Sequence, residues 1–320
     1  MKKILFVLLL TSSFVARGQV FNNEWIDYSK TYYKFKVGQT GLYRLPHSVL
    51  SAAGLGSTPA AHFQLWRNGK EVPIYISTNA STLSSGDYIE FWGERNDGKP
   101  DKELYRIADN QLSSRHSLET DTAAFFLTVN PAGNNLRLTP TNNNIATNTL
   151  LPEPYFIYTW GQYFREKMHN GYAVNVGEYL YSSSYDKGEG WTSTDIGRNA
   201  SHTVNLPNLY AYTGTAPTPK FSIAVSGNAI NPRRYRARIN GDSVTGNYVD
   251  YFNYSRDTAE FPITLISGSS GSVQVTNLGT VANDRMVVHQ YEITYPRQFN
   301  FGGATTFEFK MPASAQGNYL

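Results

Sequence analysis

The stretch HFQLWRNGKEVPIYIS, residues 62–77, decides the fold class of this chain. Asn68-Gly69 lies at its centre, and this pair favours the two-residue type I′ turn because both positions of that turn need a positive φ. Beyond the turn, Val72, Ile74 and Ile76 alternate with other residues, which indicates a strand with one apolar face. The stretch therefore predicts a β-hairpin and a chain that is mostly β.

Strand-like segments also lie on both sides of this hairpin. One short helix is expected where Pro46 precedes HSVLSAAG, with Gly54 as its stop. The other strands of this half are expected around Gly38 and Gly41 within 31–45, at 87–93 and at 123–129.

The second half alternates short strand-like segments with turns, a spacing typical of a β-sandwich or jelly roll. The exception is EPYFIYTWGQYFREKMHNG, residues 153–171, which is the best helix candidate. Asn240-Gly241 predicts a second hairpin turn. Strands are expected at 202–214, 220–227, 234–239, 242–247, 260–266, 272–279, 285–296 and 305–311.

Composition changes between residues 131 and 152, where Asn, Thr and Pro dominate and a connection between domains is expected. A chain of 320 residues is long enough for two domains with their own cores, and a 14% share of aromatic residues suits half-buried sheets. We predict a small N-terminal β domain with a short helix at 19–137, a linker at 138–152 and a β-sandwich domain at 153–320.

The N-terminus predicts export. Lys2 and Lys3 precede the apolar run Ile4–Leu10, and Ala16-Arg17-Gly18 places small residues at a cleavage site, so residues 1–18 are expected to be a signal peptide. The apolar run is too short to span a bilayer, which predicts a protein at the outer-membrane surface or outside the cell. Removal of 1–18 takes away three basic residues and no acid, so the formal net charge falls from +3 to zero and nucleic acid becomes a poor partner.

The absence of cysteine excludes disulfides, a thiolate nucleophile and Cys-ligated metal. The sequence also lacks the HExxH, GxSxG and glycine-rich phosphate-loop patterns. We therefore predict no catalytic residue, no cofactor and no metal ligand, and a hydrolase that uses Asp, His or Ser from distant segments has no motif behind it. The six histidines show no metal spacing; they are His47, His62, His116, His169, His202 and His289.

One group of acidic residues could form a calcium-binding loop. Asp97, Asp101 and Glu103 lie within seven residues and flank Gly98, but the EF-hand spacing is absent and Pro100 interrupts the loop. A polar turn after a strand is the preferred interpretation, with calcium as the alternative.

One basic cluster could bind phosphate or carboxylate groups. If it forms a strand, its last three arginines share one face and the residues between them share the other, so a solvated outer face is the preferred interpretation. The cluster consists of Arg233, Arg234, Arg236 and Arg238, and the opposite face of Tyr235, Ala237 and Ile239.

Three tripeptides match the short O-glycosylation acceptor used on exported proteins of Bacteroidetes-type bacteria. They are Asp121-Thr122-Ala123, Asp242-Ser243-Val244 and Asp257-Thr258-Ala259. Because so short a motif arises easily by chance, a chance match is the preferred interpretation, with O-glycosylation of Thr122, Ser243 and Thr258 as the alternative.

Six segments, in order, resemble the N-terminal region of gingipain-type cysteine peptidases that act as sortases of the type IX secretion system. They span most of the chain. They are FKVGQTGLYRLPHSVLSAAGL (35–55), FQLWRNGKEVPIYI (63–76), GDYIEFWGERNDGKPDKELY (86–105), HSLETDTAAFFLTVN (116–130), YDKGEGWTS (185–193) and VVHQYEITYPRQF (287–299).

The resemblance implies an accessory β region that precedes a peptidase domain with a His and Cys dyad, and a chain cut short before that domain. Because a thiolate nucleophile needs a cysteine, no catalytic residue is carried over. By the same analogy, NDGKPDKELY is a turn of the accessory region rather than a catalytic loop.

The primary hypothesis is the non-catalytic N-terminal β region of a secreted sortase that processes the C-terminal sorting signals of its cargo. Its partners would be the downstream peptidase domain and outer-membrane components of type IX secretion. The alternative is a stand-alone cell-surface β-sandwich module that binds glycan or protein, with Trp92 and Trp191 as sugar platforms.

Overall fold

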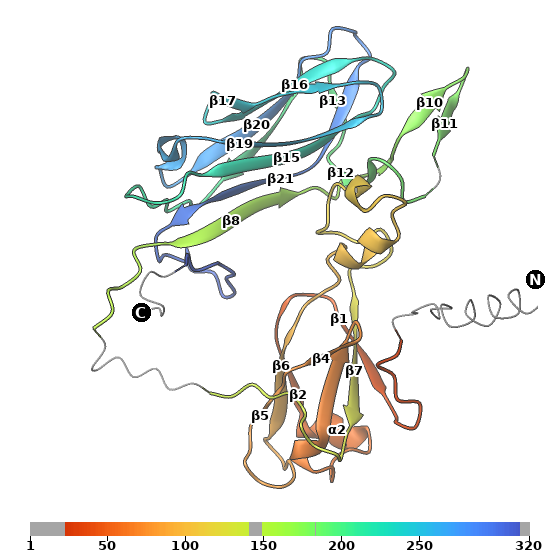
Figure 1. Cartoon of the computed structure of the whole chain (residues 1–320), viewed down its shortest axis with the longest axis vertical. Coiled ribbons are helices and arrows are strands. Elements are labelled where there is room, and N and C mark those ends of the chain that lie inside the picture. Colours follow the sequence, from red (N-terminus) through yellow and green to blue (C-terminus); the bar gives the residue numbers. More distant parts are fainter. Residues whose placement is uncertain (1–22, 141–148, 183, 314–320) are drawn as a thin grey trace, which may run out of the picture. The chain divides into compact units, whose positions relative to one another are not determined.

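Strands dominate the structure, and the predicted mostly β class is confirmed. The computed structural model describes residues 23–140, 149–182 and 184–313. The predicted signal peptide and the middle of the predicted linker lie outside these residues. The chain divides into two compact units, the first made of Met1–Arg95 and Thr122–Thr141, the second of Asn96–Asp121 and Asn142–Leu320 (Figure 1). The segment Asn96–Asp121 therefore belongs to the second unit, although it interrupts the first in sequence.

The first unit contains two antiparallel sheets with the strand orders β1-β7-β3-β4 and β2-β6-β5. Phenylalanines from both sheets share its core, where Phe35, Phe91 and Phe125 are in ring contact. The elements are β1 (Tyr33–Val37), β2 (Gly41–Pro46), α2 (His47–Ala52), a 3-10 turn (Ala60–His62), β3 (Phe63–Arg67), β4 (Lys70–Val72), β5 (Tyr75–Ile76), β6 (Tyr88–Gly93) and β7 (Ala123–Val129).

The two local predictions for the first unit are confirmed. Asn68 and Gly69 join β3 to β4 with φ values of 48° and 72°, the left-handed conformation that a type I′ turn requires. Helix α2 follows Pro46 and buries Leu50, and Gly54 takes a φ of 78° just after the helix ends.

The second unit is built on two antiparallel sheets whose inner faces share one core, which is the predicted β-sandwich. One sheet has the order β13-β21-β15-β19 with β8 also paired to β21, and the other β14-β20-β16-β17 with β18 also paired to β16 (Figure 1). Two further ribbons pair β9 with β12 and β10 with β11.

The bounds of the second unit's strands are as follows: β8 (Phe156–Tyr163), β9 (Lys167–Asn170), β10 (Ala173–Asn175), β11 (Tyr179–Tyr181), β12 (Glu189–Thr192), β13 (Ile196–Gly197), β14 (Ser201–Leu206), β15 (Lys220–Gly227), β16 (Arg233–Ile239), β17 (Asp242–Thr245), β18 (Tyr248–Val249), β19 (Tyr254–Glu260), β20 (Gly271–Asn277) and β21 (Arg285–Arg297).

The helix predicted at 153–171 is wrong, because this segment forms β8 and β9. Its aromatic residues follow a period of two rather than 3.6. Tyr158 and Trp160 lie on one side of β8, where they meet Tyr295 and Tyr291 of the paired strand β21. Aromatic side chains pack well on a pleated surface, and cross-strand partners more than a hundred residues away decide the outcome.

Two strand predictions near the sandwich ends also fail. Residues 260–266 end β19 and then form a 3-10 turn, Ile263–Ile266, after Pro262, which cannot donate to a ladder. Within 305–311, only Lys310 pairs, in an isolated bridge to Ile157 on the edge of β8. The Asn240-Gly241 turn between β16 and β17 is confirmed, with φ values of 49° and 91°.

The basic cluster on β16 is mainly the solvated face that the alternation predicts. Arg234 is exposed, whereas Tyr235, Ala237 and Ile239 are buried. Arg233 departs from this pattern, because its guanidinium is fully buried against Asp284 at 2.9 Å.

Arg233 can be buried because nearly all its donors are used. It also donates to the carbonyl oxygens of Tyr251 (2.6 Å), Ala229 (2.9 Å) and Asn231, while Asn277 donates to Asp284 at 2.9 Å. Buried ions are tolerated when their charge and their hydrogen bonds are both satisfied.

No helix among residues 23–140, 149–182 and 184–313 is long and apolar enough to cross a membrane.

We predict that Arg233→Met destabilises the protein by about 3–5 kcal/mol, because it leaves the Asp284 carboxylate buried without a counter-ion. Urea unfolding followed by circular dichroism gives this value. Arg234→Met is the matched control on the same strand, and its cost should stay below about 0.5 kcal/mol because the side chain is exposed. Equal effects of the two substitutions would contradict the assignment of Arg233 as the structural arginine.

Candidate functional site

The segment Asn96–Asp121, called the insert below, supplies one side of the candidate site. It contains two 3-10 turns, Lys99–Glu103 and Ala108–Asn110. Gly98 starts the first turn with a φ of 85°, and a Cβ at this position would lie 2.6 Å from the carbonyl oxygen of His116. Only glycine fits both demands, so the two ends of the insert approach each other at Gly98.

Asp101 holds the insert closed. Its carboxylate is 4% exposed and accepts hydrogen bonds from the Ser117 hydroxyl (2.9 and 3.0 Å) and from the backbone N–H of Leu118 (2.8 Å). The Ser117 oxygen in turn accepts from the N–H groups of Glu119 (3.1 Å) and Thr120 (3.2 Å). The side chain that the sequence offered as a calcium ligand is therefore committed to the backbone of its own loop.

The insert is fastened to the sandwich by hydrogen bonds that use backbone acceptors. The Tyr105 hydroxyl donates to the carbonyl oxygen of Glu189 (2.9 Å), and the Trp191 indole donates to that of Ser117 (3.0 Å). Arg256 on β19 donates to the carbonyl oxygen of Gln111. Each bond joins segments at least 74 residues apart, and so the insert covers an outer face of the β19-β15-β21 sheet.

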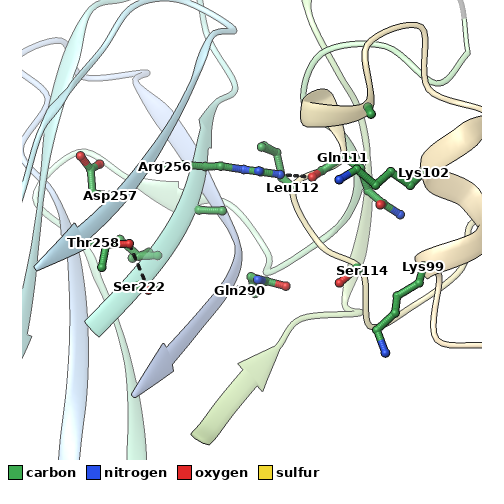
Figure 2. A pocket seen from close by; sticks show the side chains of 13 residues that line it. Lys99, Lys102, Gln111, Leu112, Ser114, Ser222, Arg256, Asp257, Thr258 and Gln290 are labelled. Carbon is green, nitrogen blue, oxygen red and sulfur yellow. Dashed lines mark hydrogen bonds between the residues drawn. The ribbon is translucent and has the colours of Figure 1, made fainter. Parts of the chain in front are cut away.

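A pocket of about 490 Å³ lies between the insert and this sheet (Figure 2). All of its lining residues belong to the second unit. The insert contributes Lys99, Lys102, Ala108, Gln111, Leu112 and Ser114, and the sheet contributes Ser222, Ile223, Ala224, Arg256, Asp257, Thr258 and Gln290.

Positive charge prevails in the pocket. Lys99 is paired with Asp97 at 2.5 Å, whereas Arg256 donates to the neutral carbonyl oxygen of Gln111. The one acid of the lining, Asp257, is occupied by hydrogen bonds from its own strand and from β16, through Ser255 and Tyr235. Figure 2 shows Lys99 and Lys102 on the insert side and Arg256 reaching across from the sheet.

The pocket also contains polar groups that can bind hydroxyls. The hydroxyls of Ser222 and Thr258 share a hydrogen bond of 3.1 Å on the sheet floor. The Oε1 atom of Gln290 is buried and has no hydrogen-bond partner within the described part of the chain. No aromatic ring lines the pocket, so a ligand would be held by charge and hydrogen bonds rather than by stacking.

The second unit also contains a buried polar cluster of Ser226, His169 and His289, which the sequence did not predict. The Ser226 hydroxyl lies 2.8 Å from Nε2 of His289, and the rings of His289 and His169 are 6.0 Å apart. Burial lowers the pKa of His289 well below its usual range, assisted by His169 and Arg256, and burial also lowers the pKa of His169. Ser226 and His289 are both 0% exposed, so the pair is sealed from any substrate and serves packing.

The remaining sequence candidates are dispersed. Within the described residues no group of three or more acidic or histidine side chains is placed to hold a metal ion, and Glu103 is exposed. Trp92 is 37% exposed on β6, in the first unit, whereas Trp191 is half-buried and carries Arg165 over its ring at 5.2 Å. The candidate sugar acceptors differ in exposure. Ser243 and Thr258 are exposed, whereas Thr122 is half-buried.

The sequence did not predict that the insert packs on the sandwich, that a pocket forms there, or that His169 and His289 lie together. The residues involved come from segments separated by up to about two hundred residues, and no local spacing records that separation. For the insert, the sequence predicted a polar turn within NDGKPDKELY. This prediction is confirmed by the 3-10 turn Lys99–Glu103, which follows Gly98.

Comparisons with known proteins bear on the fold alone. No family model and no curated protein matches the sequence. Among solved structures, the chain is similar to the crystal structure of dimeric latent PorU from Porphyromonas gingivalis, with 12% identity and a TM-score of 0.50. The match covers 85% of this chain and 25% of that one, so the chain spans about a quarter of the length of the PorU chain.

The other similarities are weaker. A carbohydrate-binding module, CBM36 in complex with calcium and xylotriose, matches 40% of this chain and 92% of its own at 12% identity and a TM-score of 0.25. The CBM36-1 domain of a xylanase from the hindgut metagenome of Trinervitermes trinervoides matches 47% of this chain and 99% of its own, at 11% identity and a TM-score of 0.25. Scores this low carry no argument about function.

We predict that Asp101→Ala destabilises the second unit by about 3 kcal/mol, because hydrogen bonds to a buried charged acceptor are lost and Ser117 is left without its partner. Urea unfolding measures the change. Glu103→Gln removes one negative charge from the same turn without a buried contact and should cost less than about 0.5 kcal/mol. Addition of calcium should leave the melting temperature of the wild type unchanged; a rise abolished by either substitution would restore the calcium interpretation.

We also predict that stability falls on mild acidification. Because the folded-state pKa of His169 and of His289 lies below the ordinary value, both rings bind protons less readily in the folded state than in the unfolded state, and unfolding takes up protons below about pH 6.5. Each ring should lower the free energy of unfolding by at most about 1.4 kcal/mol per pH unit below that point, which is the limit for one proton taken up on unfolding.

Urea unfolding at pH 7.5 and pH 5.5 measures this loss. The double variant His169→Gln/His289→Gln should show a smaller drop. Should that variant not fold, NMR of the wild type gives the answer independently, since the imidazoles of His169 and His289 should titrate below their ordinary value in the folded protein. Titration of all six imidazoles near their ordinary value would contradict the prediction.

Proposed function

We propose that this chain is the non-catalytic N-terminal β region of a secreted gingipain-type sortase of the type IX secretion system. In this proposal residues 1–18 direct export, and a peptidase domain beyond residue 320 cuts the C-terminal sorting signals of cargo at the outer-membrane surface. The β region packs against and positions that domain and docks to outer-membrane secretion components.

The observation that carries the proposal is the agreement of two independent similarities. The ordered sequence segments run from 35 to 299, and the fold similarity to PorU covers 85% of the chain at a TM-score of 0.50. The chain matches 25% of the PorU chain, which leaves room in a protein of that size for a peptidase domain. The absence of cysteine fits a region that carries no nucleophile.

An aromatic surface at one end of the sandwich suits a partner domain. Phe156 is fully buried beneath Phe299, Phe301, Phe307 and Phe309, with ring centroids 4.7 to 5.8 Å away. Three of these covering rings are themselves 40–48% exposed. Exposed apolar clusters on stable domains commonly mark interfaces. We name Phe299, Phe301 and Phe309 the aromatic end.

The aromatic end also has a fixed scaffold. Arg297 lies over the rings of Tyr158, Tyr210 and Phe307 at 4.8, 5.2 and 5.1 Å, and donates to the carbonyl oxygen of Asn300 at 2.8 and 2.9 Å. This arrangement orders the loop that presents Phe299 and Phe301. Preordered aromatic anchors lose little conformational freedom on binding.

A binding module on the cell surface is the second candidate. The polar pocket under the insert favours it, since the buried Oε1 atom of Gln290 in its lining has no hydrogen-bond partner within the described part of the chain. A glycan array probed at a protein concentration that detects millimolar affinities separates the two candidates: specific hits with no affinity for a peptidase domain would move this candidate to first place.

The first test is the reading frame after the codon for Leu320. An open frame that leads into a domain with one His and one Cys at peptidase spacing supports the proposal. A stop codon at that point would refute it and leave the binding module.

We predict that the triple substitution Phe299→Ser, Phe301→Ser and Phe309→Ser weakens binding of this region to the separately produced peptidase domain at least about tenfold, because the aromatic anchors are lost. Isothermal titration calorimetry measures the dissociation constant. The matched control replaces Val176, Leu180 and Tyr248, which are also exposed, by serine and should leave the affinity unchanged. Equal weakening by both triples would exclude the aromatic end as the interface.

A further inference from the structure

We propose that the pocket between the insert and the β19-β15-β21 sheet is a binding site for a small oxyanion that also carries a hydroxyl group. The ligand class is a hydroxylated carboxylate or a phosphate bearing an O–H. This inference goes beyond the proposed function, because it concerns the second unit alone and needs no peptidase domain.

The charge argument comes first. Three cationic side chains line the pocket, and only Lys99 has a carboxylate partner, which is Asp97. Lys102 makes no hydrogen bond or ion pair in the described part of the chain, and Arg256 is bonded to a neutral carbonyl oxygen. Lys102 and Arg256 are both exposed in the pocket lining, where each can donate charge-assisted hydrogen bonds, so an oxyanion is the complementary ligand.

The hydroxyl requirement comes from Gln290. Its Oε1 atom is buried and has no partner among the described residues, and burying an acceptor in this state costs free energy. A ligand that places an O–H at this atom removes the cost. The carboxylate of Asp257 does not compete for the ligand's donors, because Tyr235 and Ser255 donate to its Oδ2 atom and Asn247 donates to its Oδ1 atom at 2.9 Å.

The pocket has the right size and lining for such a ligand. Its volume of about 490 Å³ lies in the range of small-molecule sites. The lining has hydroxyls at Ser114, Ser222 and Thr258 and has no aromatic ring, which disfavours a flat apolar ligand. Because the insert forms one wall, the site exists only while Asp101 keeps the insert closed.

Tartrate and succinate test the two requirements separately, since they share one dicarboxylate skeleton and only tartrate has hydroxyls. Inorganic phosphate is the third probe. The wild-type chain, produced without glycosylation at Thr258, is titrated calorimetrically with each probe at low ionic strength, where charge interactions are least screened. We expect saturable millimolar binding, with tartrate favoured over succinate about threefold.

Variants assign the binding to the pocket. Lys102→Gln should weaken every probe about tenfold, whereas Arg234→Gln, which removes a charge from the other sheet, should change nothing. Gln290→Leu should abolish the preference for tartrate over succinate, and Gln290→Glu should abolish binding by repulsion. Gln290 is half-buried in the pocket lining and lies outside the sandwich core, so these variants are expected to fold.

The outcomes are distinct. Tartrate binding without phosphate binding identifies a hydroxy acid as the natural class, and the reverse identifies a phosphate. Absence of saturable binding by all three probes at tens of millimolar, or equal weakening by Arg234→Gln and Lys102→Gln, would overturn the proposal. None of these results depends on the peptidase domain, so failure here leaves the proposed function untouched.

Discussion

The closed form of the insert in the second unit depends on the buried carboxylate of Asp101. Asp101 is almost fully enclosed, yet the surrounding groups are two donors of its own loop and not a cation. A buried carboxylate is stable only where donors are fixed around it, and these donors are fixed only if the loop is closed. The closed loop then presents Tyr105 to the backbone near β12 and the carbonyl of Ser117 to Trp191. A local electrostatic requirement thus determines how a long-range surface of the sandwich is covered.

In the β-sandwich, by contrast, pairing between strands that are distant in sequence decides the secondary structure, as it does for β8, which pairs with β21. β21 is the central strand, because it pairs with β15 over most of its length and also with β8 and β13 (Figure 1). Its register shifts between Ala224 and Val225 of β15, and this irregularity lies beside His289. The bulge explains how a titratable ring comes to be buried against Ser226 in a strand that otherwise alternates regularly.

Features that depend on local backbone conformation could be predicted from the sequence, whereas features that depend on distant contacts could not. The turns at Asn68-Gly69 and Asn240-Gly241 and the helix stop at Gly54 depend on backbone conformations that few residues adopt, so local sequence identifies them. Residues 153–171 could not be assigned in this way, because Tyr158 and Trp160 find partners on β21 that no nearby residue reveals. Arg233 likewise lies directly beside Arg234 in one basic run, and the distant Asp284 is what distinguishes the buried arginine from the exposed one. The pocket could not be predicted for the same reason, because its lining residues come from segments that lie far apart in the sequence.

The membership of residues 96–121 has a consequence for the order in which the chain folds. The polypeptide passes between the two units three times, at 95/96, at 121/122 and at 141/142. During synthesis or export, β7, which completes a sheet of the first unit, emerges shortly after this segment. Arg256 of β19, which fastens the segment to the sheet, emerges more than a hundred residues later. The first unit can therefore close while the segment between β6 and β7 stays looped out and unprotected. That interval exposes Tyr105 and Leu112 to proteases and chaperones, and it ends only when β19 and β21 have paired with β15.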